Sequence, residues 1–96
     1  MKVARLIDYK KFEFSDSDII EPIDGECLLK VKVVSICGTD IRREYNKDWS
    51  KESYPQSVGL PCHEIVGEIY RSKSKLFKEG DRVLAVPTSD NGLQEY

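Results

Sequence analysis

The sequence predicts a small, mainly β domain, either a barrel or a partly open sandwich, with one or two short helices. Short apolar segments with alternating or β-branched patterns recur along the chain, and clusters of Gly, Pro, Asp and Ser separate them. Helical periodicity is weak. With 96 residues, the chain is long enough for one hydrophobic core. The strands are therefore expected to form a single domain.

Three strands are expected in the first third of the chain, at residues 2–8, 10–14 and 26–34. In the last of them, Leu29, Val31 and Val33 alternate with lysines, whereas residues 34–36 continue in the opposite phase. A change of phase by one residue is what a β-bulge produces, and bulges often redirect side chains beside a functional site. We therefore expect a bulge shortly before Cys37.

A short helix and a long loop are predicted next. Thr39 or Asp40 is a suitable cap for a helix of one or two turns, with Ile41 and Tyr45 four residues apart on its inner face. Residues 46–61 are rich in Asn, Ser, Pro and Gly. A loop of this length usually has a functional surface.

Two further strands are expected at residues 64–71 and 81–87, after a turn signal at Gly80 and Asp81. The last residues, 91–96, read as a turn and the start of another strand. A chain that stops where a strand begins favours truncation. A native edge strand at the C-terminus is the alternative.

Composition excludes several functional classes. The 15 Lys and Arg residues and 17 Asp and Glu residues give a net charge of −2, so no positive surface for nucleic acid or an anionic membrane is expected. Arg5 and Asp8 interrupt the first apolar stretch, which excludes a signal-peptide core, and no apolar window has the length of a membrane span. The cytoplasm is the expected location.

Three cysteines, Cys27, Cys37 and Cys62, are an odd and widely spaced set, which indicates free thiols or metal ligands rather than a disulfide framework. His63 is the only histidine, and it lies where the long loop enters a strand. Zinc accepts thiolate and imidazole ligands, and a catalytic zinc leaves one position for water or substrate. Spacing alone leaves two readings of Cys37 and His63: zinc ligands, or a buried thiol and a half-exposed histidine.

Three motifs occur in order along the chain: "C-G-T-D" at 37–40, "H-E-I-V-G-E-I" at 63–69 and "G-D-R-V" at 80–83, followed by "G-L-Q-E-Y" at 92–96. In this combination the chain resembles the N-terminal, GroES-like catalytic domain of the zinc-dependent medium-chain alcohol dehydrogenases. The resemblance implies a partly open GroES-like β-barrel over residues 1–96, a single substrate and zinc domain.

The resemblance also implies roles for five residues. Cys37 and His63 match catalytic zinc ligands, and Glu64 matches a carboxylate that approaches or ligates the metal. Thr39 matches a hydroxyl that relays the substrate's proton, although a helix cap is the alternative. Asp40 matches a carboxylate that accepts the far N–H of the ligand histidine; capping or plain solvation is the alternative. For Glu64 the alternative is a surface glutamate.

The chain departs from the family pattern at two positions. Cys62 replaces a glycine, so it is either strained, merely small and tolerated, or itself a metal ligand. Arg42 replaces the histidine that ends the proton relay in many relatives. Two alternatives follow: protons pass to water instead, or Arg42 contacts an anionic group of the substrate or cofactor. No cluster of four cysteines follows Val83, so no structural zinc is expected, and Cys27 is expected to be a small core residue.

The implied activity is hydride transfer from an alcohol, polyol or sugar held by one zinc ion to NAD or NADP. The G-x-G-x-x-G turn of a nucleotide-binding Rossmann domain is absent from the sequence, so the 96 residues alone are expected to be inactive. A homo-oligomer is compatible with this reading. Two alternatives are a GroES-like binding or structural module without catalysis, and a chaperonin lid subunit, which leaves Cys37 and His63 unexplained.

Overall fold

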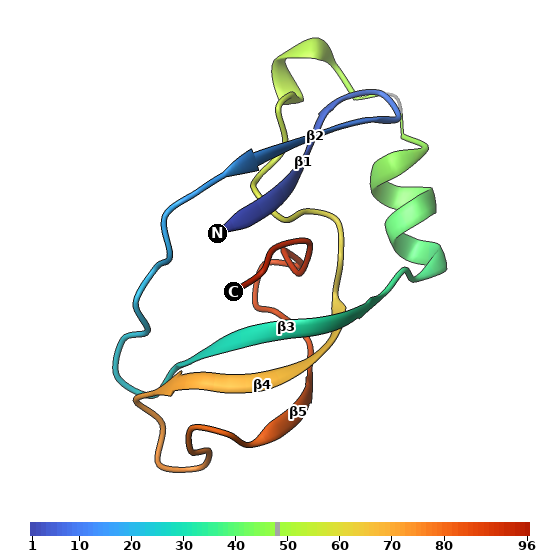
Figure 1. Ribbon diagram of the computed structural model, residues 1–96. Helices are drawn as coiled ribbons and strands as arrows, with labels where there is room; N and C mark the ends of the chain where they lie inside the picture. Colours follow the sequence, from blue (N-terminus) through green and yellow to red (C-terminus); the bar gives the residue numbers. More distant parts are fainter. Residues whose placement is uncertain (48) are drawn as a thin grey trace.

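A computed structural model describes residues 1–47 and 49–96. The described residues form two antiparallel sheets that do not close into a barrel (Figure 1). The strands are β1 (Lys2–Asp8) and β2 (Lys11–Asp16) in one sheet, and β3 (Cys27–Ser35), β4 (Glu64–Ser72) and β5 (Arg82–Ala85) in the other. The predicted mainly β, partly open GroES-like architecture is confirmed, because all five predicted strands form.

The first sheet is a hairpin whose inner face supplies much of the core. Val3, Ala4 and Leu6 of β1 are buried, and Leu6 is fully enclosed. The strands are joined at a tight turn in which Lys10 has a left-handed backbone (φ 55°). In β2 only Phe12 is half-buried, and the other side chains are exposed.

The second sheet contains the predicted bulge. Val31 pairs with Gly67 and Val33 pairs with Val66, so the register shifts at Lys32. The bulge changes which face the following residues occupy, as the sequence pattern indicated. Gly67 is needed at this crossing because a Cβ there would collide with the carbonyl oxygen of Lys30.

The C-terminal segment, residues 90–95, lies between the two sheets and ties them together (Figure 1). The Ala4 N–H donates to the Leu93 carbonyl (2.9 Å), and the Val31 N–H donates to the Glu95 carbonyl (2.9 Å). The prediction of a further strand here is wrong. The segment forms only isolated bridges, one of them between Val3 and Gln94, because it pairs briefly with each sheet in turn.

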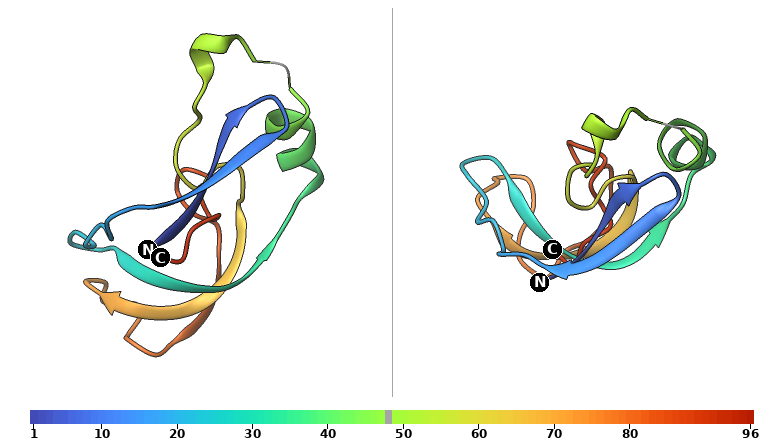
Figure 2. Two further views of the ribbon diagram at one scale, coloured as in Figure 1. Left: turned by 45° about the horizontal axis from the view of Figure 1, so that its top comes forward. Right: turned by 90° about the horizontal axis from the view of Figure 1, so that it is seen from above.

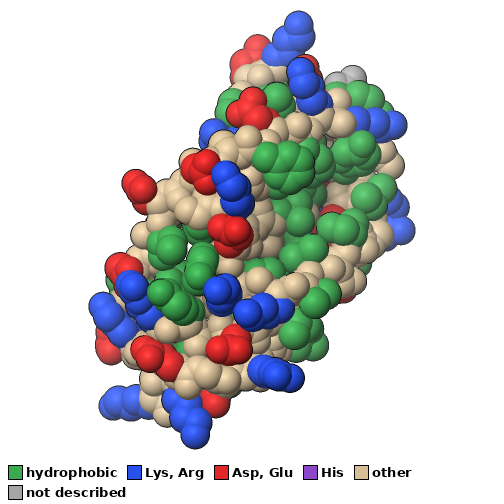
Figure 3. Space-filling model, viewed as in Figure 1, with side chains coloured by type: hydrophobic (Ala, Val, Ile, Leu, Met, Phe, Trp, Pro, Cys, Tyr) green, Lys and Arg blue, Asp and Glu red, His purple; other side chains and the backbone are tan. Residues whose placement is uncertain are grey.

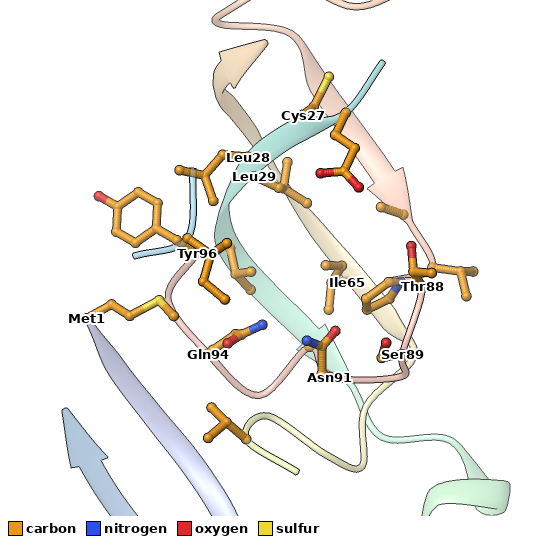
Figure 4. A pocket seen from close by; sticks show the side chains of 18 of the residues that line it. Met1, Cys27, Leu28, Leu29, Ile65, Thr88, Ser89, Asn91, Gln94 and Tyr96 are labelled. Carbon is orange, nitrogen blue, oxygen red and sulfur yellow. The ribbon is translucent and has the colours of Figure 1, made fainter. Parts of the chain in front are cut away.

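The core between the sheets is small. Buried apolar side chains are few: Val3, Ala4, Leu6, Cys62, Ile65 and Ile69. A hollow of about 670 Å³ remains between the sheets, with Leu29, Ile65, Asn91 and Gln94 on its walls (Figure 4). The chain ends lie side by side next to it (Figure 2), and hydrophobic side chains are exposed among charged ones on the visible face (Figure 3).

Two short helices follow β3. The first, η1 (Asp40–Tyr45), is a π-helix preceded by Thr39, and its Tyr45 ring stacks on Phe12 with ring centroids 5.9 Å apart. The second, η2 (Lys51–Ser53), interrupts the predicted loop 46–61, of which Asp48 lies outside the described residues. Neither described helix is long and apolar enough to cross a lipid bilayer.

Gly59→Ala is expected to lower the free energy of unfolding more than Gly25→Ala. Both glycines have a left-handed backbone (φ 81° and 85°), so alanine costs about 1–2 kcal/mol at either position. At Gly59 alone, the added Cβ would also meet the backbone of Asn91, which adds about 1–3 kcal/mol. Urea unfolding followed by circular dichroism measures the difference. Equal losses would contradict the tight packing of the C-terminal segment against Gly59.

Candidate metal centre

The pairing of β3 with β4 brings the candidate ligands together. Ser35, at the end of β3, pairs with Glu64, at the start of β4. Cys37 follows Ser35 by two residues and His63 directly precedes Glu64, so both leave the sheet at the same end (Figure 1). Two segments far apart in the sequence thereby face one another.

Three potential ligand atoms converge at this end of the sheet. The Cys37 sulfur, a ring nitrogen of His63 and a carboxylate oxygen of Glu64 all lie within 4.8 Å of one another. All three side chains are half-buried, which leaves room for a further ligand from solvent. Thiolate, imidazole and carboxylate are the three donor types that zinc accepts in proteins. This donor set fits a zinc ion with an open position.

Asp40 fixes the orientation of the site. Its side chain is only 4% exposed, and its Oδ1 lies 2.7 Å from Nδ1 of His63. Its Oδ2 accepts the backbone N–H of Cys37 at 2.9 Å. Because Nδ1 is held by the carboxylate, Nε2 is the nitrogen left for a metal. One buried carboxylate thus positions both Cys37 and His63.

The electrostatics favour a thiolate beside an imidazolium. Hydrogen bonding by the Thr39 hydroxyl, followed by its backbone, lowers the pKa of Cys37, with a smaller contribution from His63. Partial burial acts to lower the pKa of His63, but hydrogen bonds with Cys37 and Asp40 outweigh it, and the pKa is raised. Both shifts favour the charged forms of the side chains, and a metal ion competes with protons for each of them.

Residues 23–95 match the family described as the alcohol dehydrogenase GroES-like domain. The chain belongs to this family. L-galactonate-5-dehydrogenase of Escherichia coli (strain K12) is 36% identical over 80 residues, which are 81% of this chain and 22% of that protein. L-threonine 3-dehydrogenase of Salmonella newport (strain SL254) is 38% identical over 71 residues, 70% of this chain and 20% of that protein.

This GroES-like domain therefore spans about a fifth of the length of the curated relatives it matches. No solved structure matches the chain. The relatives' names support a family of dehydrogenases.

Cys62 lies outside the ligand cluster of the described residues. It is fully buried, and its sulfur lies 3.8 Å from the backbone carbonyls of Ser35 and Glu64. Burial raises the pKa of its thiol. Its backbone is not left-handed, so the glycine of the family pattern is not required by φ. Of the three interpretations of Cys62, the structure supports a small, tolerated side chain.

Cys27 is half-buried on β3, and its sulfur lies 3.4 Å from the Ser72 hydroxyl.

A second hollow, here called the charged hollow, adjoins His63, whereas Cys37 and Glu64 are not among the residues that line it. It measures about 250 Å³, and its polar walls are formed by Thr39, Asp40, Arg43, Glu44, His63 and Asp90. Thr39 is one of the residues that line it, and its side chain makes no capping hydrogen bond to the helix. Arg42 extends over Gly38.

Sequence reasoning missed Arg43, Glu44 and Asp90. The first two were detectable as charged residues of the predicted short helix. Asp90 was not, because it reaches the site from a distant loop through a hydrogen bond of its carbonyl with the Cys62 N–H (2.7 Å).

Asp40→Asn is expected to lower the pKa of His63, because the carboxylate charge and its hydrogen bond favour the imidazolium. His63 is the only histidine, so its proton resonances report this pKa without overlap in an NMR titration. Asp24→Asn, a change of an exposed carboxylate, serves as the control and leaves the pKa unchanged. An unchanged pKa in Asp40→Asn would contradict the orienting role of Asp40.

Thr39→Val is expected to raise the pKa of Cys37, because the hydroxyl of Thr39 contributes most to lowering it. Thr39→Ser keeps a hydroxyl and is expected to stay close to the wild type. The measurement is the pH dependence of Cys37 alkylation, quantified by mass spectrometry of its peptide. If Val and Ser variants titrate alike, the hydroxyl does not stabilise the thiolate.

Proposed function

We propose that this chain is the zinc-binding catalytic domain of an NAD- or NADP-linked dehydrogenase that oxidises a small alcohol, polyol or sugar. The observation that carries the proposal is the arrangement around Asp40. Its carboxylate binds the Cys37 N–H and Nδ1 of His63, while the Cys37 sulfur, His63 and Glu64 converge within 4.8 Å. The alternative interpretation, in which Cys37 is an ordinary buried thiol and His63 an unrelated half-exposed histidine, gives no reason for this arrangement.

The chain's own residues have distinct tasks in this reaction. Oxidation removes a hydride from the carbinol carbon, which the nicotinamide accepts, and a proton from the hydroxyl, leaving a carbonyl compound. A zinc ion, when bound, acts as a Lewis acid that lowers the pKa of the alcohol. Cys37, His63 and Glu64 hold the metal, and Asp40 keeps the His63 ring in one tautomer and orientation. Thr39 accepts the substrate's proton and passes it toward solvent through the charged hollow.

A nicotinamide site has to come from a separate domain. The sequence has no G-x-G-x-x-G turn, and the aligned stretches make up only 22% and 20% of the dehydrogenases it matches. We therefore propose that the domain works with a dinucleotide-binding domain and that these 96 residues alone do not transfer hydride. The names of the relatives, which specify galactonate and threonine, favour a small, polar, hydroxylated substrate.

We also propose a cytoplasmic location for the reaction. The described cysteines are free thiols, and free thiols persist in reducing compartments. Oxidation of Cys37 would remove a zinc ligand, so a reducing environment suits the proposed site.

The chain is expected to bind Co²⁺, used as a probe for zinc, with a sulfur-to-metal absorption band. Cys37→Ser combined with His63→Ala is expected to abolish the band and to weaken Zn²⁺ binding by more than about 100-fold, because two of three ligands are lost. The affinity of the wild type is expected to rise from about pH 5 to pH 8, since protons on His63 compete with the metal at low pH.

Cys27→Ser is the matched control, because it removes a thiol that lies outside the ligand cluster. It is expected to bind metal like the wild type. Equal Zn²⁺ affinity in the wild type and the double variant would overturn the proposed metal site. A lost band in Cys27→Ser would do the same.

A further inference from the structure

Cys62, the residue before the candidate ligand His63, is held by residues 90–92 of the loop after β5, here called the clamp loop. The N–H of Cys62 donates to the carbonyl of Asp90 at 2.7 Å, and the carbonyl of Cys62 accepts the N–H of Gly92 at 2.9 Å. Both polar groups of the Cys62 backbone are therefore bound by the clamp loop. The path of the chain into β4 is fixed at this point.

Gly92 is the residue of the clamp loop that has no space for a side chain. A Cβ at this position would lie 2.5 Å from Cγ2 of Ile65, 3.0 Å from the carbonyl oxygen of Cys62 and 3.2 Å from its sulfur. The backbone of Gly92 is not left-handed, so alanine is opposed by space rather than by φ. All three atoms belong to residues that flank the candidate ligands His63 and Glu64.

The sulfur of Cys62 extends this contact to the neighbouring strand. It is fully buried and lies 3.8 Å from the backbone carbonyls of Ser35 and Glu64, the two residues that pair where β3 meets β4. Protein interiors are closely packed, so a displaced side chain displaces its neighbours. A side chain at position 92 would therefore disturb the pairing that brings the candidate ligands together.

Asp90 shows that the clamp loop is held in one conformation. Its backbone is left-handed (φ 52°), which is unfavourable for residues other than glycine and least so for Asn and Asp. Such a conformation persists only where surrounding contacts determine the backbone, and it is concentrated at functional sites. The hydrogen bond from the Cys62 N–H is one of these contacts.

We propose that Gly92 is a positioning residue of the metal centre. Without a side chain at this position, the clamp loop holds Cys62 where the next residue, His63, meets the Asp40 carboxylate. The loop acts through its backbone, so the charge of Asp90 is not required. This inference rests on the proposed function for its role in metal binding, whereas the placement of His63 is measurable without a metal.

The first test compares Gly92→Ala with Gly80→Ala, the control for a loss of stability. Gly80 has a left-handed backbone (φ 89°) with nothing within 4 Å of an added Cβ, and its N–H bonds to Ile69, far along β4 from the site. In the metal-free chain, Nδ1 of His63 lies 2.7 Å from Asp40, so its proton is expected to give a downfield NMR resonance. We expect this resonance to be lost in Gly92→Ala and retained in Gly80→Ala.

Metal binding is the second measurement. Gly92→Ala is expected to weaken Zn²⁺ binding by about 10–100-fold, as the loss of an orienting partner of a ligand does. At saturating Co²⁺, its sulfur-to-metal band is expected to shift, because the ligands no longer converge as in the wild type. Gly80→Ala is expected to change neither quantity at a temperature at which circular dichroism shows both variants to be folded.

Variants of Asp90 test the same loop if Gly92→Ala does not fold. Asparagine tolerates a left-handed backbone, so Asp90→Asn removes the charge but keeps the clamp, and it is expected to bind Zn²⁺ like the wild type. Valine is β-branched and does not tolerate this conformation. Asp90→Val is therefore expected to weaken Zn²⁺ binding. Equal affinities of the two variants would contradict a clamp that acts through the backbone.

Failure of this inference differs from failure of the proposed function. If Gly92→Ala keeps the wild-type His63 resonance and Zn²⁺ affinity, or if Gly80→Ala changes both as much, the metal site stands and the positioning role is rejected. If the wild type does not bind Zn²⁺ but Gly92→Ala alone loses the His63 resonance, the placement of His63 by the clamp loop stands and the metal site is rejected.

Discussion

The candidate site depends on one pairing in the second sheet, between Ser35 of β3 and Glu64 of β4. This pairing determines where the two strands meet their loops, and it therefore places Cys37 opposite His63. The Asp40 carboxylate then holds both segments, through the Cys37 N–H and Nδ1 of His63. A buried carboxylate with two well-placed donors is stable only if both segments keep this geometry. The sheet register and the buried charge thus reinforce one another.

The rest of the domain supports this end of the sheet through backbone hydrogen bonds more than through a large core. The C-terminal segment bonds to β1 and β3, and Gly59 and Cys62 bond to the same segment near the site. These contacts also bring Asp90 to the charged hollow. A loop that stabilises the fold therefore supplies one of the charged side chains of this hollow, while η1 supplies Arg43 and Glu44.

Much of the fold could be predicted because its signals are local. Alternating valines and lysines predicted the strand that ends at Ser35 and its bulge, and Gly67 marked a close backbone approach. The proximity of Cys37, His63 and Glu64 was implied by the family resemblance, which rests on three motifs in order along the chain. Their binding of zinc remains a prediction. The sharing of residues 90–95 between two sheets was not predictable, because alternation of side chains does not encode which partner strand is chosen. The same long-range packing hid the role of Asp90.

The most direct test is X-ray absorption spectroscopy at the zinc edge of the Zn²⁺-loaded chain, which separates sulfur ligands from nitrogen and oxygen ligands. We expect one sulfur at about 2.3 Å, from Cys37, with the remaining ligands nitrogen or oxygen at about 2.0–2.2 Å. Two sulfurs would show that Cys62 or Cys27 joins the shell and would contradict the site centred on Asp40 and His63. A shell without sulfur would contradict it more completely, because Cys37 would then have no part in binding the metal.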